Sequence, residues 1–321
     1  MPTELNPQDL LVAVSHRWGI EMTRLRSDLS LAGSPERTAW RSVVEAGDNR
    51  LFILEKIPSQ VYSRKRRIAA TLQWLSENGL HQIVTCLPDV DNETITLINA
   101  GMWHGLWQLS PYVAGINLDR PAYALDDWRG EAAAEFLIHL DNICKKHHAE
   151  PYNESFSIAV YCRTLFSTLT DRHPDIAAAF RPFMDHLEAH FFPIHDPLPM
   201  GFCHGDFHPL NIIWGQQDIR AVIDWEFCGS KPDIYDLANL LGCLGMEDPR
   251  SLTGAFSGRL IHCLRKANIF CDASWNALPD LTIAIRFAWL SEWLRKNDRP
   301  MIGLEADYMA LLLKHRSKWI H

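Results

Sequence analysis

The stretch HGDFHPLNII, residues 204–213, decides how the rest of this chain can be interpreted. It places two histidines, an aspartate and an asparagine at the start of an apolar run, and WGQQDIRAVIDWEF follows at residues 214–227. Turn-forming residues at 215–218 between two short β-prone runs predict a β-hairpin. Because the two strands of a hairpin return to the same end, we expect Asp224 to lie beside Asn211, with Asp206 just before the first strand.

Asp206, Asn211 and Asp224 therefore form a predicted cluster of side-chain oxygens. Mg²⁺ prefers oxygen ligands and is commonly held by one or two carboxylates together with substrate phosphates. An Asp, then an Asn, then a second Asp after a hairpin is the arrangement that phosphoryl-transfer enzymes use. The pattern predicts Asp206 as the catalytic base and Asn211 and Asp224 as metal ligands. The alternative is that all three are ordinary polar turn residues.

Two further motifs strengthen the first one. HGDFHPLNII, followed by VIDWEF at 222–227 and DIYDLANLL at 233–241, resembles the aminoglycoside phosphotransferase and choline kinase family, which is related to the protein kinases. The resemblance implies an α+β, protein-kinase-like two-lobed fold, with a small β-rich N-terminal lobe and a larger, mainly helical C-terminal lobe. It also implies an ATP- and Mg²⁺-dependent kinase that acts on the hydroxyl group of a small molecule.

The resemblance assigns roles to three more residues near these motifs. His204 would support the catalytic loop, and His208 would lie near the phosphate end of the site. Asp236 would brace the same loop by hydrogen bonds from the helix that follows. His204 and His208 could instead be ligands of a transition metal, but Gly205 and Pro209 disfavour the helix that such a spacing requires.

The resemblance also predicts a nucleotide-binding region upstream. Gly33 and Ser34, in a turn between the first two strands, are expected to bring backbone N–H groups close to the ATP phosphates. In LFILEKI, residues 51–57, alternation places Lys56 on the same strand face as Phe52 and Leu54, so Lys56 is the candidate for pairing with phosphates. The alternatives are that Gly33 is an ordinary turn residue and that Lys56 is an ordinary edge-strand charge.

The helix after that strand departs from the family pattern. A glutamate is expected there as the partner of the strand lysine, but the region reads RKRRIAATLQ and holds no acid before Glu77. Either Glu77 or Glu55, on the other strand face, takes that place, or Lys56 is held in some other way. The basic run at residues 64–67 is interpreted as the solvated start of the helix, with a phosphate or partner patch as the alternative.

Three residues are candidates for the acceptor pocket. In the family, C-terminal helices build this pocket, and Trp289 with Glu292 could bind an amine-bearing substrate by a cation–π contact and by charge. Glu226, close after Asp224, is the third candidate. Tryptophans at helical spacing are also typical of a hydrophobic core, which is the alternative for Trp289.

The domain organisation follows from the distribution of β-prone and helical segments. Residues 1–110 are expected to form the N-terminal nucleotide-binding lobe, 111–117 the hinge, and 118–321 the C-terminal catalytic and acceptor-binding lobe. β-prone runs dominate the first third of the chain, whereas long amphipathic helical patterns dominate the remainder.

Composition narrows the class of protein. The chain has 321 residues, 47% of them hydrophobic, and a formal net charge of −8. This negative charge argues against nucleic acid and anionic membranes as main partners and favours a neutral or cationic small-molecule acceptor. The eight cysteines are scattered singly, and no apolar run reaches membrane-spanning length, so a cytoplasmic protein with reduced thiols is expected.

Two other functions remain open from the sequence. A metal-dependent phosphohydrolase could use His204, Asp206, His208 and Asp224, and would need no ATP. A pseudokinase-like binding protein would explain the missing helix acid, but a degenerate site has no physical need to keep Asp206, Asn211 and Asp224 together.

Overall fold

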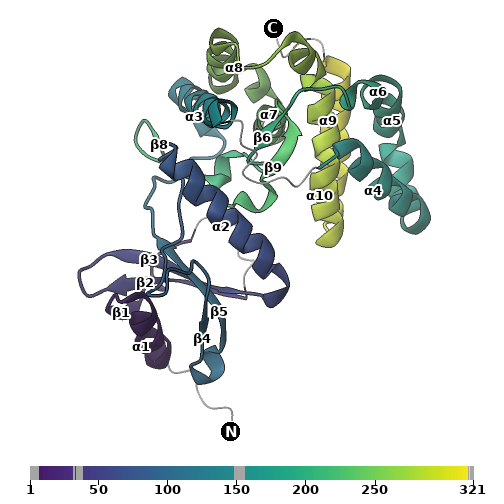
Figure 1. The fold of residues 1–321 in the computed structure, drawn as a ribbon. Coiled ribbons are helices and arrows are strands. Elements are labelled where there is room, and N and C mark those ends of the chain that lie inside the picture. Colours follow the sequence, from purple (N-terminus) through teal and green to yellow (C-terminus); the bar gives the residue numbers. More distant parts are fainter. Residues whose placement is uncertain (1–6, 32, 34–38, 148–155, 317, 319–321) are drawn as a thin grey trace. The chain divides into compact units, whose positions relative to one another are not determined.

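The computed structural model of this chain describes residues 7–31, 33, 39–147, 156–316 and 318. The chain divides into two compact units. The first unit comprises residues 1–116, 210–215 and 219–226, and the second comprises residues 117–209, 216–218 and 227–321. Figure 1 labels the helices and strands of both units along the chain.

The described part of the first unit contains a five-stranded antiparallel sheet with the order β1-β2-β3-β5-β4, the helices α1 and α2, and the hairpin of β7 and β8. The strand expected over residues 51–57 is present, and a helix follows it as expected. The elements of this unit are α1 (Pro7–Trp18), β1 (Met22–Leu25), β2 (Trp40–Ala46), β3 (Leu51–Ile57), α2 (Tyr62–Glu77), β4 (Thr96–Ile98), β5 (Gly105–Pro111), β7 (Ile212–Trp214) and β8 (Ile219–Val222).

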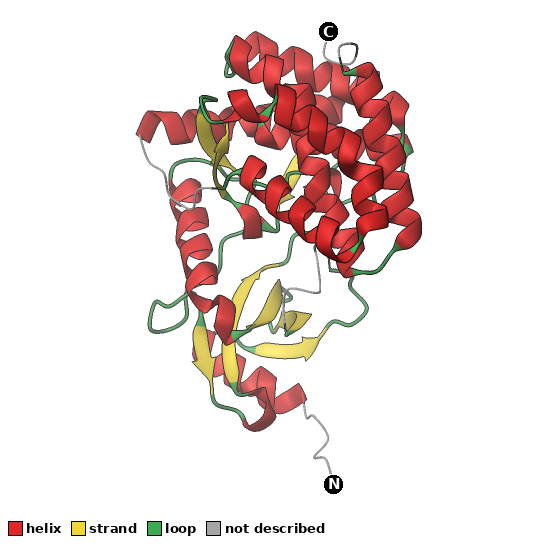
Figure 2. Ribbon diagram, turned by 90° about the vertical axis from the view of Figure 1, so that its right-hand side faces the viewer, coloured by secondary structure: helices red, strands yellow, loops and turns green. Residues whose placement is uncertain are grey.

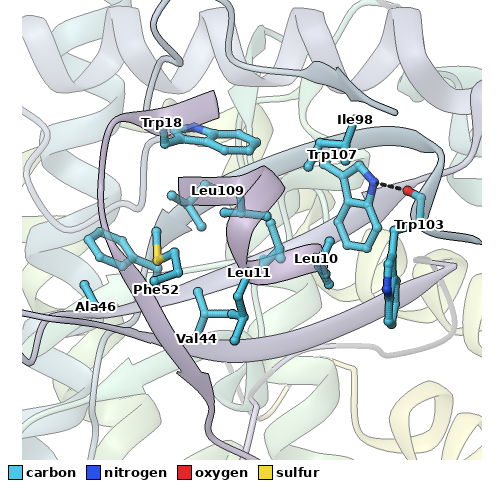
Figure 3. Close-up of a cluster of buried hydrophobic side chains, with 13 residues drawn as sticks. Leu10, Leu11, Trp18, Val44, Ala46, Phe52, Ile98, Trp103, Trp107 and Leu109 are labelled. Carbon is cyan, nitrogen blue, oxygen red and sulfur yellow. Dashed lines mark hydrogen bonds between the residues drawn. The ribbon is translucent and has the colours of Figure 1, made fainter. Parts of the chain in front are cut away.

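One face of the five-stranded sheet is covered by α1. Apolar residues at helical spacing on α1 meet every second residue of β2, β3 and β5, because side chains alternate between the two faces of a strand. Figure 3 shows this cluster, in which the Trp107 indole N–H donates to the Trp103 carbonyl over 2.9 Å. The buried residues are Leu10, Leu11, Val14, Trp18, Met22, Val44, Ala46, Phe52, Leu54, Ile98, Trp103, Trp107 and Leu109.

The β7–β8 hairpin belongs to the first unit, although it follows the catalytic loop in sequence. The Val222 N–H donates to the Gln82 carbonyl over 2.8 Å, and the Ile116 N–H donates to the Trp214 carbonyl over 2.8 Å. By their contacts, residues 210–215 and 219–226 are thus grouped with residues 1–116. The reason is that backbone groups along the hairpin find their partners at residues 82 and 116.

The second unit is mainly helical, with one two-stranded sheet made of β6 and β9 (Figure 2). Its elements are α3 (Asp127–His147), α4 (Ile158–Arg172), α5 (Pro174–His190), α6 (Phe192–His195), β6 (Met200–Cys203), β9 (Gly229–Pro232), α7 (Tyr235–Glu247), α8 (Ala255–Ala267), α9 (Asp272–Arg295) and α10 (Arg299–His315). The expected α+β class, with a β-rich first part and a mainly helical remainder, is confirmed. Within the described ranges, the helices include none with the length and apolar character needed to cross a bilayer.

Candidate active site

The loop between β6 and the hairpin holds the predicted catalytic residues of the second unit. His204 is fully buried, and its Nδ1 accepts a hydrogen bond of 3.1 Å from the Asp206 backbone N–H. The ring proton therefore lies on Nε2 when the imidazole is neutral. His204 thus fixes the backbone that carries Asp206, while the side chain of Asp206 stays partly exposed and has His208 Nε2 at 3.7 Å from its Oδ1.

Asp236 braces this loop from the first turn of α7. Its Oδ2 accepts from the His204 N–H over 2.7 Å, and its Oδ1 accepts from the Gly205 N–H over 2.8 Å. Burial raises the pKa of the Asp236 carboxyl above its ordinary value, although His204 and the two backbone donors act in the opposite direction. Both carboxylate oxygens are thus used to hold loop backbone, so Asp236 is not available to bind a metal.

Contacts to α3 and α7 also hold the same loop. The Phe207 ring stacks on Phe136 of α3, with ring centroids 5.5 Å apart and an interplanar angle of 6°. Asn239 of α7 donates to the Phe207 carbonyl over 3.3 Å. Because Phe207 is fully buried between Asp206 and His208, it anchors the loop that carries both residues.

Gly205 is required in this loop for two reasons. Its φ is +82°, and a Cβ built there would lie 2.1 Å from the Phe227 carbonyl oxygen, a backbone atom of the same unit. Gly205→Ala is therefore expected to lower the free energy of unfolding by about 2–4 kcal/mol, which a urea titration measures.

The matched control for Gly205→Ala is Gly258→Ala. Gly258 is an exposed residue of α8 with no atom within 4 Å of a built Cβ. There the substitution is expected to raise stability by up to about 1 kcal/mol. Equal effects of the two alanines would contradict the close approach at Gly205.

The predicted metal ligands lie at the open end of the hairpin in the first unit. Ile212 pairs with Val222, and the Ile223 N–H donates to the Asn211 carbonyl over 2.9 Å. Asn211 and Asp224 are therefore at neighbouring ends of the two strands. Asp224 has a φ of +66°, a left-handed conformation that is uncommon for residues other than glycine and occurs mainly in Asn and Asp.

Helix α2 secures the chain just after Asp224. The Lys65 ammonium forms an ion pair with the Glu226 carboxylate, and Arg64 donates to the Glu226 carbonyl. Burial alone would lower the pKa of Lys65, but the carboxylates of Glu226 and Glu55 raise it above its ordinary value. The basic run at 64–67 is thus not simply a solvated helix start, because two of its members hold the segment that follows a predicted metal ligand.

Gly33 lies beside Asp224, whereas Ser34 falls outside the described residues. A Cβ built on Gly33 would be 4.0 Å from Asp224 Oδ2 and 3.5 Å from Nη1 of Arg41, and the φ of Gly33 is +86°. The residue that the sequence predicted to lie next to the nucleotide phosphates, Gly33, is therefore close to the predicted metal ligand Asp224.

Lys56 lies on the opposite face of the sheet from Arg41 and Glu55. As the alternation predicted, it shares a face with Phe52 and Leu54, and that face is the one covered by α1. Its Nζ lies 5.7 Å from the centroid of the Trp107 ring. Glu77, one proposed partner, accepts instead from Gln73 over 2.8 Å on the surface of α2.

Among the acceptor-pocket candidates of the second unit, Trp289 lies near the catalytic loop. Its ring is 5.6 Å from the His208 ring, and its Nε1 donates to Asn239 Oδ1 over 3.4 Å. Glu292 instead pairs with Arg295 and Lys296 at 2.7 Å and 3.0 Å, and these contacts lower its pKa to about 2. Glu226 is occupied by Lys65 in the first unit.

The histidines are not arranged as a transition-metal site. In the part of the chain that the structure describes, no group of three or more His, Cys, Asp or Glu side chains is placed to hold a metal ion. The residues at 211 and 224 fit Mg²⁺ instead, since this ion takes few protein ligands and completes its shell with water and phosphate oxygens.

Sequence reasoning did not identify Lys65 and Arg41 as residues near the predicted metal ligands. Lys65 is 159 positions away from Asp224 along the chain, so only the tertiary structure reveals its ion pair with Glu226. For Arg41 the sequence did contain a signal for its pairing with Glu55. It is separated from Glu55 by a predicted tight turn between two strands, and the register places the two residues directly opposite each other.

Comparison with solved structures identifies the fold of this chain. A solved amicoumacin kinase in complex with AMP-PNP, Ca²⁺ and Ami matches with a TM-score of 0.66 and 17% identity, and the match covers 100% of this chain and 96% of that one. At this level of identity the likeness establishes the fold alone. The expected protein-kinase-like fold is confirmed.

Sequence relatives include two homoserine kinases. The enzyme of Rhodospirillum rubrum is 30% identical over 165 residues, which are 48% of this chain and 50% of that protein. The chain thus spans about half the length of this relative. The enzyme of Gluconacetobacter diazotrophicus is 25% identical over 327 aligned positions, which cover 91% of this chain and 94% of that protein.

The family model described as the phosphotransferase enzyme family matches residues 37–268, a range that contains the catalytic loop, the hairpin and Asp236. Since this match covers well over half of the 321 residues and includes each of the three motifs, the chain belongs to the phosphotransferase enzyme family.

Proposed function

We propose that this protein is an ATP- and Mg²⁺-dependent kinase that phosphorylates a hydroxyl group of a small molecule. The observation that carries the proposal is the register of the hairpin, in which the Ile223 N–H donates to the Asn211 carbonyl. This bond supports a shared role for Asn211 and Asp224 at one end of the ribbon. In a family of phosphotransferases, an amide and a carboxylate at the same end of a hairpin are best explained as residues that together bind a metal–nucleotide complex.

The residues of the first unit would bind the nucleotide. Asn211 and Asp224 would hold Mg²⁺, which neutralises charge on the phosphates when it is bound. The backbone at Gly33 would approach the phosphates, because the missing side chain leaves room there. The ion pair of Lys65 with Glu226 would keep Asp224 in its left-handed conformation, since it fixes the chain two residues later.

The residues of the second unit would prepare the acceptor. Asp206 would accept the proton of the attacking hydroxyl or orient it, and His208 would contribute polar contacts beside it. His204 and Asp236 would keep the loop backbone rigid, because both are buried and hydrogen-bonded to it. Only five positions separate Asp206 from Asn211 along the chain, so the acceptor-orienting and metal-binding residues are covalently linked at short range.

The acceptor is proposed as a small hydroxylated molecule, with a preference for cationic compounds. The net charge of −8 supports this preference through the electrostatic field of the whole protein. Homoserine is the first compound to test because relatives of this chain are named homoserine kinases, and aminoglycosides and amicoumacin follow from the structural likeness. Trp289 is proposed to line the acceptor pocket, since its ring is in edge-to-face contact with His208.

Thermal denaturation tests the nucleotide part of this function. At a ligand concentration about 100 times its Kd, binding stabilises the folded state by about 2.7 kcal/mol. ATP with Mg²⁺ is therefore expected to raise the melting temperature clearly, whereas ATP alone or Mg²⁺ alone should have little effect. Absence of any shift with the pair would contradict the proposal.

An ATP-consumption screen over homoserine, aminoglycosides and other hydroxylated metabolites tests the transfer itself, with the Asp206→Ala protein as the blank. A kinase consumes ATP only with an acceptor, at a rate far above that blank. A metal-dependent phosphohydrolase would instead cleave phosphate esters without ATP. A pseudokinase-like protein would show the thermal shift while the wild type and the blank consumed ATP equally with every acceptor.

A further inference from the structure

The five-stranded sheet presents two faces with different chemistry. The face toward α1 is apolar and ends at Lys56. On the opposite face, Arg41, Glu55 and Gln108 lie directly across from one another on β2, β3 and β5, because the register pairs Arg41 with Glu55 and Glu55 with Gln108. We call these three residues the polar row.

Arg41 of the polar row lies near the predicted metal ligand Asp224. Nη1 of Arg41 is 3.5 Å from the Cβ position of Gly33, and Asp224 Oδ2 is 4.0 Å from that same position. The guanidinium and the carboxylate therefore both lie within 4.0 Å of one point. All of these residues belong to the first unit.

The guanidinium of Arg41 is largely buried and incompletely satisfied. Its side chain is 12% exposed, and Nη1 has Glu55 Oε1 as an ion-pair partner at 3.9 Å, which is too long for a hydrogen bond. Its Nε is buried and has no hydrogen-bond partner in the described structure. Buried donors without partners are rare in native proteins and often mark the place of a missing ligand or ion.

The ion pair with Glu55 leaves Arg41 with a hydrogen-bond donor that has no partner in the described structure. Glu55 uses Oε2 to accept a hydrogen bond of 2.5 Å from Gln108, and its field also acts on Lys65. Lys65 in turn is held by Glu226. Of the two cations here, Lys65 is thus engaged with carboxylates, whereas Arg41 keeps donor capacity for an incoming anion.

We propose that Arg41 is the residue that binds the nucleotide phosphates, in the role that the sequence pattern assigned to Lys56. A guanidinium offers several N–H donors in a planar fork that matches phosphate oxygens. A cation at this point also offsets the repulsion between phosphates and the carboxylates of Asp224 and Glu55. This inference rests on the proposed nucleotide-binding function, and it identifies the cation of that site.

Calorimetric titration with Mg²⁺·AMP-PNP and with adenosine tests the proposal without relying on turnover. The Arg41→Gln variant is expected to bind Mg²⁺·AMP-PNP about 10- to 100-fold more weakly than wild type, because it lacks a charge-assisted hydrogen-bonding partner for the phosphates. Adenosine has no phosphate, so its affinity should stay within about threefold of wild type. Arg41→Lys keeps the charge without the fork and should give an intermediate affinity.

Two further variants serve as comparisons. Arg50→Met removes the same charge from an exposed position just before β3, where Arg50 pairs with Asp48 and lies over the Phe52 ring, and this variant should bind Mg²⁺·AMP-PNP like wild type. Lys56→Met tests the strand-lysine assignment directly and should also bind normally.

The outcomes separate this inference from the function on which it rests. If wild-type protein binds Mg²⁺·AMP-PNP and Arg41→Gln binds it equally well, or if the loss occurs in Lys56→Met instead, the role of Arg41 is wrong. If wild type binds no Mg²⁺·AMP-PNP, the proposed function itself fails. Should Arg41→Gln melt far below wild type, the comparison of Arg41→Lys with wild type decides the question.

Discussion

Asp206→Asn is expected to lower the rate constant of phosphoryl transfer about 10²- to 10⁴-fold, the usual effect of removing a positioned proton acceptor. The asparagine side chain has nearly the same shape as the aspartate but accepts no proton at neutral pH. Because the Asp206 backbone N–H bonds to His204 and the substitution keeps this bond, the loop should keep its conformation. The measurement is kcat with the acceptor that the ATP-consumption screen identifies.

The same variant supplies its own control. Asn211 and Asp224 are the proposed Mg²⁺ ligands, and Asp206 is not one of them. The affinity of Asp206→Asn for Mg²⁺·AMP-PNP is therefore expected to stay within about threefold of wild type, a change of less than 1 kcal/mol. An unchanged kcat would remove Asp206 from the proposed chemistry. A parallel loss of nucleotide affinity and kcat would point to a collapsed loop, and a thermal melt would detect it.

Asp224→Asn should abolish the Mg²⁺-dependent part of nucleotide binding. Loss of a residue that merely supports a metal ligand typically lowers metal affinity about 10- to 100-fold. Replacing the metal-binding carboxylate itself by a neutral amide should have a larger effect, so we expect the affinity for the Mg²⁺–nucleotide complex to fall about 100-fold or more. Asparagine is the appropriate replacement because, like aspartate, it tolerates the φ of +66° at this position. Alanine would add backbone strain to the loss of the ligand.

The readout for Asp224→Asn is the thermal shift produced by ATP with Mg²⁺, repeated at increasing Mg²⁺ concentration. Wild type should be stabilised by the pair, and the variant should not be. Asp218→Asn, at an exposed position in the turn of the same hairpin, is the matched control and should behave like wild type. A normal shift in Asp224→Asn would exclude Asp224 as a metal ligand and remove the main support for the proposed function.

The amino-acid sequence by itself was sufficient for the local structure around these residues. A loop containing Gly205, a hairpin with its turn at 215–218, and helices at apolar spacing all follow from turn chemistry and periodicity, which act between residues close in sequence. The class of the fold followed as well, because β-prone segments fill the first third of the chain and helical segments the rest.

The tertiary structure determined which strand face is covered and which distant segments are in contact, and sequence periodicity does not determine either. Alternation separates the residues of β3 into two sets, but it does not state which set α1 covers, so it could not place Lys56 on the covered face and Glu55 with Arg41 on the other. Likewise, the bonds of the hairpin to residues 82 and 116, and of Lys65 to Glu226, join segments far apart in sequence. Such contacts depend on packing of the whole unit, for which a single sequence carries no local signal.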